Sequence, residues 1–380
     1  MEHWLISFRC KSSERAQLWD SLRNEVLTNS LCTTSTFNID QQFKSGSLDS
    51  LVALADDLSK LDHQLEATIR KIERQYTDLE PNPKLTISIS NRGNSQDLAP
   101  STYLSDFHWD ISKYPPSKSL SEISTMIDER LKKLDEDIKK ESTEFIEMRN
   151  SVSQITKRES GGLLNRDLND ILVPSICNAE DFFNTEYLKT LLVVVPKKEV
   201  EQWLATYEQL SQRVVPQSTK QFNIEEKDGN TLWRVVILKI GESEFLVNAK
   251  KNRWVVREFE FNPEKNMEEK KMNDKQKVSF SNKQKVLIEL CKSVFSELFI
   301  ALTHLKAIRI YIESILRYSL PPQYFSIIVT PKDGQQKRIL NGLVNKFLMP
   351  GERPNMFCSK EESEDGEDYF PFVFLRMPKY

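Results

Sequence analysis

Apolar residues recur every three or four positions along three long stretches of the chain, residues 43–76, 120–158 and 280–315. This spacing is typical of amphipathic helices, because one helical turn takes about 3.6 residues. In the second stretch the steps are mainly four and three, as in a coiled coil. That series comprises Leu120, Ile127, Leu131, Leu134, Ile138, Phe145, Met148, Val152 and Ile155. The pattern predicts three long helices, of which the last two pair antiparallel along their apolar seams.

The third stretch ends in the sequence HLKAIRIYIESILRYSLPP, residues 304–322. Its periodicity predicts a one-sided, packed helix with charged residues on the opposite faces. The double proline at its end stops the helix, because proline lacks a backbone donor and disfavours helical geometry in the residue before it. The stripe consists of Leu305, Ile308, Ile312 and Ile315, and the charged residues are Lys306, Arg309, Glu313 and Arg317.

The stretch between the two later helices has a different texture, with short strand-like and helical segments in alternation. We predict strands at residues 190–196 and 231–240, followed by further strand-like runs at 245–252 and 254–261. An amphipathic helix is predicted at residues 199–212. Segments of this kind and length indicate a compact, inserted α+β domain.

The two chain ends carry the remaining strand signals. Residues 4–8, 33–39, 324–332 and 369–377 read as strands, with a helix at 335–347. Residues 81–100, which contain three prolines, three asparagines and Gly93, read as a loop, and the lysine-rich run 265–285 as a solvated helix or a flexible joint. The ends therefore look like two halves of one domain, and the fold class is predicted to be α+β and elongated.

Composition excludes several classes of function. The 53 Lys and Arg residues nearly balance the 56 Asp and Glu residues, so no overall basic charge favours nucleic acid. Only 10 of the 380 residues are glycine, which argues against phosphate-binding loops and nucleophile elbows. The apolar run Trp4–Phe8 is too short for a signal peptide, and no run approaches the roughly 18 apolar residues of a membrane span.

Chemistry-bearing motifs are not found in the sequence. The five scattered cysteines have no C-x-x-C pair and read as reduced thiols, and the four histidines have no metal-ligand spacing. No phosphate loop, dinucleotide fingerprint or hydrolase elbow occurs, so we expect neither an enzyme nor a bound cofactor. The lysine pairs 197–198 and 250–251 could dock an acidic helix or filament, although ordinary solubility is the better explanation of them.

Several blocks of sequence resemble the C subunit of the vacuolar-type proton ATPase (V-ATPase) and occur in that family's order. The block at 304–322 is the most specific. The others are FKSGSLDSLVALADDLSKLD at 43–62, LNRDLNDILVP at 164–174, LLVVVPK at 191–197, VVP at 214–216 and VREFEFN at 256–262. Residues 79–99, 263–279 and 335–368 match the family poorly.

The resemblance implies a foot domain built from both termini, a neck of two long helices and an inserted head domain. On this sequence the foot would comprise residues 1–140 and 291–380, the neck residues 141–162 and 262–290, and the head residues 163–261. Residues Gly161 and Gly162 would form the joint between neck and head.

The resemblance also implies a function without catalysis. The family's members are part of the stator, where the head holds a peripheral stalk of the E and G subunits and the foot meets a second stalk and the N-terminal domain of the a subunit. Their reversible association controls assembly of the pump. We therefore expect a cytoplasmic protein that is peripheral on the vacuole and other acidic membranes only through the complex. Binding of actin is a weaker implication.

No motif of the family identifies single contact residues. We place the head contact on Trp203, Tyr207, Arg234 and Lys250, with the alternative that the two aromatic residues belong to the core. The foot contact is placed on Arg309 and Arg317 or on the acidic loop 361–368, with the alternative that the arginines form internal ion pairs. A coiled-coil scaffold or actin-binding protein unconnected to a pump is the competing function.

Overall fold

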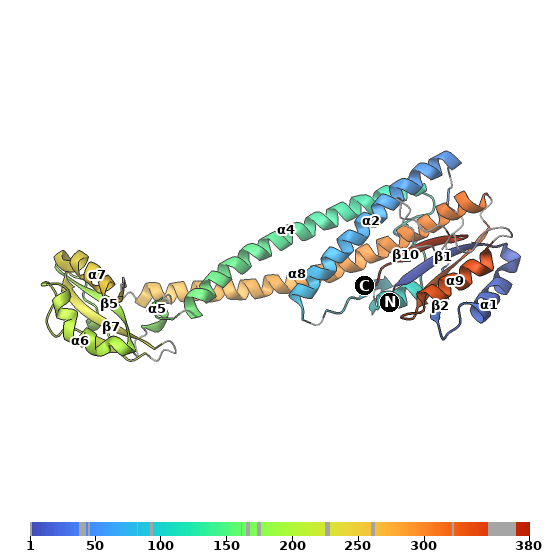
Figure 1. Cartoon of the computed structure of the whole chain (residues 1–380). Coiled ribbons are helices and arrows are strands. Elements are labelled where there is room, and N and C mark those ends of the chain that lie inside the picture. The colour runs from blue at the N-terminus through green and yellow to red at the C-terminus, as the bar shows by residue number, and fades with distance from the viewer. Residues whose placement is uncertain are drawn as a thin grey trace. The chain divides into compact units, whose positions relative to one another are not determined.

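The structure is a computed structural model with side chains (Figure 1). It describes residues 2–37, 43–44, 46–81, 83–91, 94–160, 162–164, 168–172, 176–224, 229–259, 263–320, 323–348 and 370–380. The chain divides into two compact units. The first unit joins residues 1–142 to residues 285–380, and the second comprises residues 143–284.

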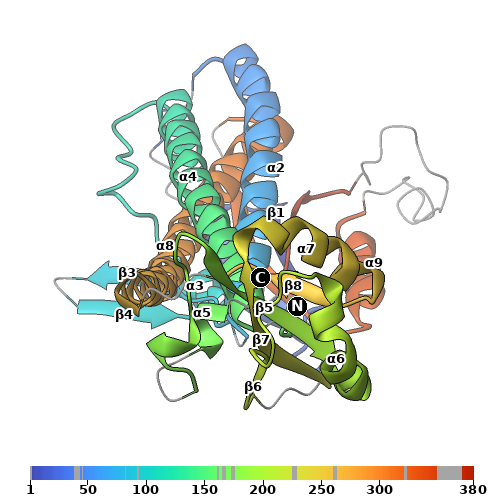
Figure 2. The same ribbon diagram turned by 90° about the vertical axis from the view of Figure 1, so that its left-hand side faces the viewer.

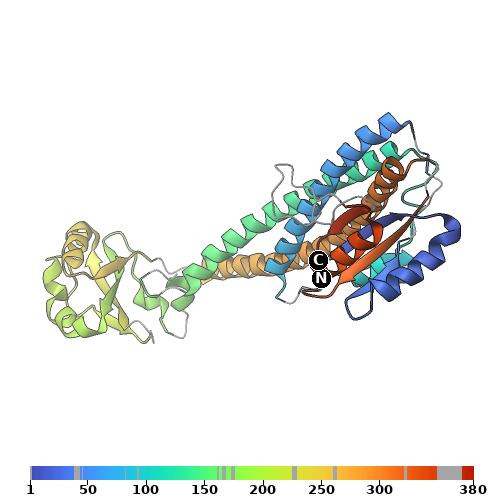
Figure 3. The ribbon, with the colours of Figure 1, turned by 45° about the vertical axis from the view of Figure 1, so that its right-hand side comes forward.

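The first unit contains a four-stranded antiparallel sheet of order β10-β1-β9-β2. Its strands are β1 (His3–Arg9), β2 (Cys32–Thr36), β9 (Tyr324–Pro331) and β10 (Val373–Met377). In the central strand, Leu5 lies opposite Ile328 on one side and Leu375 on the other. The first and last strands of the chain are thus neighbours, and Figure 3 shows the two termini side by side. Both ends of the chain therefore contribute strands to the same sheet.

One face of this sheet is covered by α1 (Arg15–Glu25), which follows the short 3₁₀ turn Ser12–Glu14, and by α9 (Gln336–Phe347) (Figure 3). The core between them is apolar and includes Trp4, Ile6, Phe8, Leu22, Ile327, Val329, Ile339, Leu343 and Phe372. Residues of both chain ends contribute to this core, so neither end can complete it alone.

Helix α8 (Pro263–Tyr318) packs against the other side of the sheet. The hydroxyl groups of Ser7 and Ser314 share a hydrogen bond of 2.7 Å, and Tyr318 Oη donates to the Ser7 carbonyl. Between residues 301 and 312 only Arg309 is more than slightly exposed. The prediction that this helix is one-sided is therefore wrong, because it is surrounded by the sheet and by other helices.

The two other long helices of the first unit are α2 (Leu48–Leu79) and α4 (Leu120–Ser160). They lie beside each other, with an ion pair of 3.2 Å between Lys71 and Asp135. Ser47 caps α2 by accepting a hydrogen bond from the Ser50 amide. The three long helices predicted from the apolar periodicity are thus confirmed. A hairpin, β3 (Ile87–Asn91) and β4 (Asn94–Leu98), and α3 (Pro100–Ser105) complete the unit, so the loop prediction for residues 81–100 is wrong.

The second unit holds the other four-stranded antiparallel sheet, of order β6-β7-β5-β8 (Figure 2). Its strands are β5 (Leu188–Pro196), β6 (Lys220–Phe222), β7 (Asn230–Leu238) and β8 (Val255–Arg257). Two helices, α6 (Val200–Thr206) and α7 (Glu242–Lys251), cover one face, together with 3₁₀ turns at Lys197–Glu199, Tyr207–Leu210 and Lys239–Gly241. The other face is covered by α5 (Leu168–Ile171), the 3₁₀ turn Ala179–Asp181 and their flanking segments.

Two sequence predictions in this unit need correction. The run 245–252, predicted as strand-like, lies in α7, because Phe245 and Ala249 are spaced to face the sheet from a helix. The predicted helix at 199–212 is interrupted, with α6 between two 3₁₀ turns.

The lysine-rich run 265–285 is a continuous part of α8. In this unit α8 runs antiparallel to α4, since Glu144 pairs with Lys283 and Phe145 stacks on Phe280.

The fold is therefore α+β, as predicted, and its sheets are antiparallel. The division into foot, neck and head and its boundaries stay predictions. Of the predicted joint, Gly161 lies outside the described residues.

Candidate functional site

The predicted contact residues Trp203 and Tyr207 belong to the apolar core of the second unit. Trp203 is 0% exposed, and its indole meets that of Trp254 edge to face at 5.1 Å between centroids. Tyr207 is 4% exposed and donates from its hydroxyl to Glu208, and burial raises its pKa. These side chains present almost no surface, so the alternative of core residues describes their place.

Arg234 and Lys250 differ from each other in their surroundings. Arg234 lies on β7 with Nη1 at 2.9 Å from Asp181 Oδ1, and Lys220 donates to the same carboxylate at 2.9 Å. Lys250 is exposed on α7 and forms no ion pair with any described residue. Of the four predicted contacts in this unit, Lys250 alone is an unpaired surface charge.

Asp181 is a nearly buried carboxylate, 5% exposed, at the end of the 3₁₀ turn that covers the sheet. Burial by itself raises the pKa of Asp181, but hydrogen bonds from Lys220 and the Asn178 amide, with the charge of Arg234, hold it below its ordinary value. The carboxylate thereby ties the turn to β6 and β7, which is a structural role.

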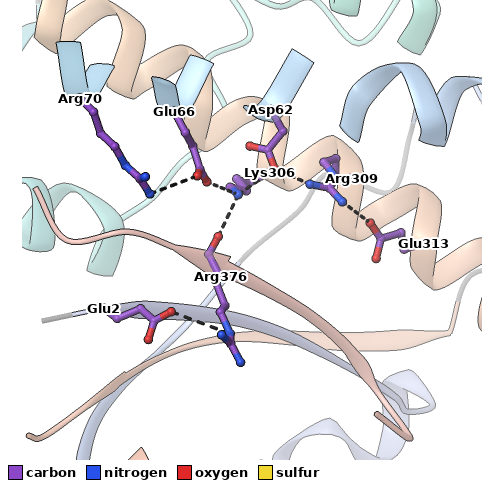
Figure 4. Close-up of polar contacts among 8 residues, drawn as sticks. All are labelled: Glu2, Asp62, Glu66, Arg70, Lys306, Arg309, Glu313 and Arg376. Carbon is purple, nitrogen blue, oxygen red and sulfur yellow. Dashed lines mark hydrogen bonds and ion pairs between the residues drawn. The ribbon is translucent and has the colours of Figure 1, made fainter. Parts of the chain in front are cut away.

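Of the two arginines predicted for the other contact, Arg309 is half-buried in the first unit, whereas Arg317 is exposed near the end of α8. Arg309 donates to Asp62 and, at 3.2 Å, to Glu313, and Figure 4 shows these groups together. Arg317 donates from Nη1 to the Phe372 carbonyl at 2.5 Å. The alternative of internal pairs therefore describes Arg309, whereas Arg317 binds a backbone carbonyl. The other predicted contact, the loop 361–368, lies outside the described residues.

Figure 4 shows a buried ion cluster around Lys306 that joins three parts of the chain. Lys306 Nζ donates at 2.8 Å to each of three acceptors, which are Asp62 Oδ2, Glu66 Oε1 and the Arg376 carbonyl. These acceptors belong to α2 and β10, whereas Lys306 belongs to α8. Lys306 is 3% exposed, so the face predicted to lie opposite the apolar stripe is buried here as well.

All three protons of the Lys306 ammonium find acceptors, which is the condition under which a charge is tolerated in a protein interior. Asp62 Oδ1 and Arg309 Nε are buried and have no hydrogen-bond partner among the described residues. The sequence shows which charges share a helix face, but not that the two faces meet. Asp62 and Glu66 are four residues apart, and Lys306 and Arg309 are three apart, which places two acids on one helix face and two bases on another.

A second buried polar contact in the first unit involves His304, within an aromatic cage of Phe107, Trp109 and Tyr114. Its Nε2 accepts from the Asp110 amide at 3.0 Å, and its Nδ1 lies 2.8 Å from the Ile300 carbonyl. Burial lowers the pKa of His304 to about 4, so the imidazole is neutral at pH 7. It fastens the segment 107–114 to α8.

Neither cluster is arranged for catalysis. Within the described residues, no group of three or more His, Cys, Asp or Glu side chains could hold a metal ion. The four described cysteines are buried and unbridged, and burial raises the pKa of Cys32 and Cys291 to about 11. Such thiols are poor nucleophiles at neutral pH. In the described part of the chain, no helix combines the length and apolarity that a bilayer crossing requires.

The chain matches a known protein family over most of its length. The family model of the V-ATPase C subunit matches residues 3–373. The chain belongs to the family of V-ATPase C subunits. It is 33% identical to the C subunit of the V-type proton ATPase of Caenorhabditis elegans, with 99% of this chain and 96% of the relative covered. For the C 1-A subunit of the V-type proton ATPase of Danio rerio the identity is 31%, with 99% and 97% covered.

Membership of this family assigns the chain to a proton-transporting ATPase as a non-catalytic component, in agreement with the resemblance found in the sequence. Among solved structures, the cytoplasmic N-terminal domain of the I subunit, a homologue of the a subunit of V-ATPase, aligns with 11% identity over 90% of this chain and 97% of that one. The TM-score of 0.28 is too low to support any argument about fold.

Proposed function

We propose that the chain is a stator and regulatory subunit of the vacuolar proton-translocating ATPase. ATP hydrolysis turns a central rotor, and a fixed collar is needed because the catalytic part would otherwise rotate with it. The observation that carries this proposal is the family match, which extends over nearly the whole chain, residues 3–373.

The finer proposal concerns the partners. The second unit, corresponding to the head, holds a peripheral stalk of the E and G subunits, and the first unit, corresponding to the foot, meets a second stalk and the N-terminal domain of the a subunit. The protein is cytoplasmic and reaches the vacuolar membrane only within the complex, and its release and rebinding control pump assembly. Each unit has a core of its own, which supports the idea of two separate binding modules.

Loss of the protein tests the main proposal. In cells that lack it, acidification of the vacuole or equivalent organelle, followed with a pH-sensitive dye, is expected to fail, and re-expression of the full chain is expected to restore it. Normal acidification without the protein would contradict the proposal.

Binding tests the partners. The purified full chain is expected to bind the heterodimer of the E and G subunits, measured by calorimetry, and to co-purify with other ATPase components from native membranes. Co-purification with cytoskeletal proteins alone would instead favour a scaffold or actin-binding protein unconnected to a pump.

A further inference from the structure

The outer face of α7 and of the 3₁₀ turn Lys239–Gly241 that precedes it carries large apolar side chains that are exposed. Ile240 is 77% exposed, Val247 is 56% and Leu246 is 37%. Tyr187, 65% exposed, is next to them, since its carbonyl accepts a hydrogen bond of 2.9 Å from the Lys239 amide. Single exposed apolar residues are ordinary, but a contiguous group of them marks a binding surface.

Helical geometry makes this group a stripe. The 3₁₀ turn Lys239–Gly241 leads directly into α7, so the chain is helical from Lys239 to Lys251. Ile240 and Val247 are seven residues apart and therefore lie on the same side of the helix, with Ser243 between them. At about 1.5 Å per residue, the helix that bears the stripe is roughly 20 Å long.

The opposite side of α7 packs against the rest of the second unit. Phe245 and Ala249 are buried, and Asn248 donates at 2.8 Å to the Leu210 carbonyl. At the start of the helix, a side chain at Gly241 would collide with Arg213, since an added Cβ would lie 2.4 Å from the Arg213 Cβ. The junction is therefore held close to the domain, which leaves Ile240 pointing outward.

The charges around the stripe are mainly basic. Lys239 and Lys250 are exposed and form no ion pair with any described residue, and Lys251 contacts only Asn248, at 3.2 Å. Of the acids on the helix, Glu242 pairs with Lys189 at 2.6 Å, whereas Glu244 keeps its negative charge and accepts a hydrogen bond from Ser211 at 2.7 Å. Glu186, next to Tyr187, is also exposed, so the charge around the stripe is mixed, with three lysines against two acids and a positive balance.

A polar recess of about 350 Å³ borders the same helix. It is lined mainly by amide and hydroxyl side chains of α6 and α7 and their ends, namely Gln202, Thr206, Gln209, Asn248 and Asn252, with Leu210 and Lys251. Amide groups both donate and accept hydrogen bonds, so the recess suits a polar side chain beside an apolar contact.

We propose that this surface, the α7 face, docks an amphipathic helix whose apolar stripe is bordered by Asp and Glu. The inference rests on the proposed function, in which the occupant is a helix of the peripheral stalk formed by the E and G subunits. A helix fits because the exposed apolar residues follow a straight helical stripe, against which a second helix packs side chain between side chains. Acidic borders fit because lysines outnumber the acids beside this surface, which gives it a positive balance.

The test measures binding of the E–G heterodimer to the full chain by calorimetry. In one variant, Ile240→Glu is combined with Val247→Glu, which buries carboxylates against the expected acidic helix. The matched control combines Leu164→Glu with Met272→Glu, two residues of the same unit that are 45% and 64% exposed and lie outside α7. Circular dichroism and thermal unfolding check that each variant is folded.

We expect the α7 variant to bind at least about tenfold more weakly than the wild type and the control to bind normally. Equal binding by the α7 variant and the wild type would overturn this inference and leave the proposed function intact. Equal weakening by the control would also overturn it, because the effect would then not belong to this face. No binding by the wild-type chain would count against the proposed function, and the inference would fall with it.

Charge provides a second measurement. Lys239→Gln combined with Lys250→Gln is expected to lower the association rate at low salt by about tenfold and to weaken its dependence on salt. An unchanged rate and salt dependence would contradict the acidic character of the partner.

Discussion

Each unit of the protein contains one nearly buried aspartate that is neutralised by a lysine and an arginine, and the two sites differ in what they join. Asp62, 1% exposed, contacts Lys306 and Arg309, which are more than 240 residues away in sequence and within the interior of the first unit. Asp181, 5% exposed, contacts Lys220 and Arg234, about 40 to 50 residues away, and the side chain of Lys220 is 49% exposed.

The difference shows how the same chemistry serves two purposes. In the first unit the charges hold together helices and a strand from opposite ends of the chain, and the buried Asp62 and Lys306 cannot regain water when a partner is lost. In the second unit the charges attach a short turn to the sheet, and the lysine keeps access to solvent. A buried pair is costly to break because the remaining charge stays uncompensated, whereas an exposed partner is rehydrated.

The largest effect is expected for Lys306→Met. Loss of this ammonium leaves Asp62 and Glu66 short of a buried cation, so the first unit should lose about 3–5 kcal/mol of stability. Hydrogen exchange measures this directly, because amides of α2 and β10 should exchange faster. Lys292→Met on the same helix, whose side chain is 39% exposed, is the control and should change stability by less than about 1 kcal/mol. Similar effects of the two variants would contradict the assigned role.

A smaller effect is expected for Asp181→Asn, about 1–3 kcal/mol, confined to the second unit. The asparagine keeps the shape but loses the charge, and Lys220 can turn to water. This loss of stability is measured by hydrogen exchange, in which the amides of β6 and β7 should exchange faster than in the wild type. The exposed neighbour Glu180 offers the control Glu180→Gln, which should leave exchange unchanged. A loss as large as that of Lys306→Met would show that the two sites are equivalent after all.

At neutral pH the smallest effect is that of the histidines, which act only as the pH falls and separate the units, because all four lie in the first one. The folded-state pKa of His304 is lowered to about 4, against an ordinary value of about 6.5. Its stabilising contribution is thus complete above pH 6.5 and is lost as the pH falls towards 4, since the unfolded chain then binds a proton that the folded chain does not.

His304→Gln should therefore flatten the pH dependence of the first unit's stability by about 1.4 kcal/mol per pH unit in this range. Unfolding by urea at pH 7, 6 and 5 measures the slope. The buried His3, whose pKa is also lowered to about 4 by burial, keeps part of the slope in this variant. His108→Gln, at an exposed histidine, is the control and should leave the slope unchanged, and equal slopes for the His304 variant and the wild type would contradict the assignment.

Much of the architecture could be predicted from local pattern. The helices α2, α4 and α8 and the strands β1, β5, β7 and β9 follow from apolar periodicity and β-branched runs. The misses have physical causes. The run 245–252 has the composition of a strand, but it turns its apolar residues to two sides, Phe245 and Ala249 into the core and Leu246 and Val247 outward, which a helix permits.

The positions of the predicted contact residues could not be read from the sequence, because residue type does not decide whether a side chain is buried. Trp203 and Tyr207 are the kind of residues that partner interfaces favour, yet both are in the core. Lys250 lies at the α7 face, whereas Ile240 and Val247 gave no signal in the sequence, since an apolar residue at a helical spacing normally faces the core. Their exposure depends on how α7 packs on its sheet, with Phe245 and Ala249 inward and this side of the helix uncovered.

The family, the α+β class and the long helices could be recognised from the sequence, because they depend on residue order and on periods of a few residues. Which charges are buried and which apolar groups are exposed depends instead on how distant segments of the chain pack together. Lys306 illustrates the reason. It occupies an ordinary charged position in a helical pattern, and its burial depends on acids and a carbonyl supplied by α2 and β10, at sequence separations that no local pattern can register.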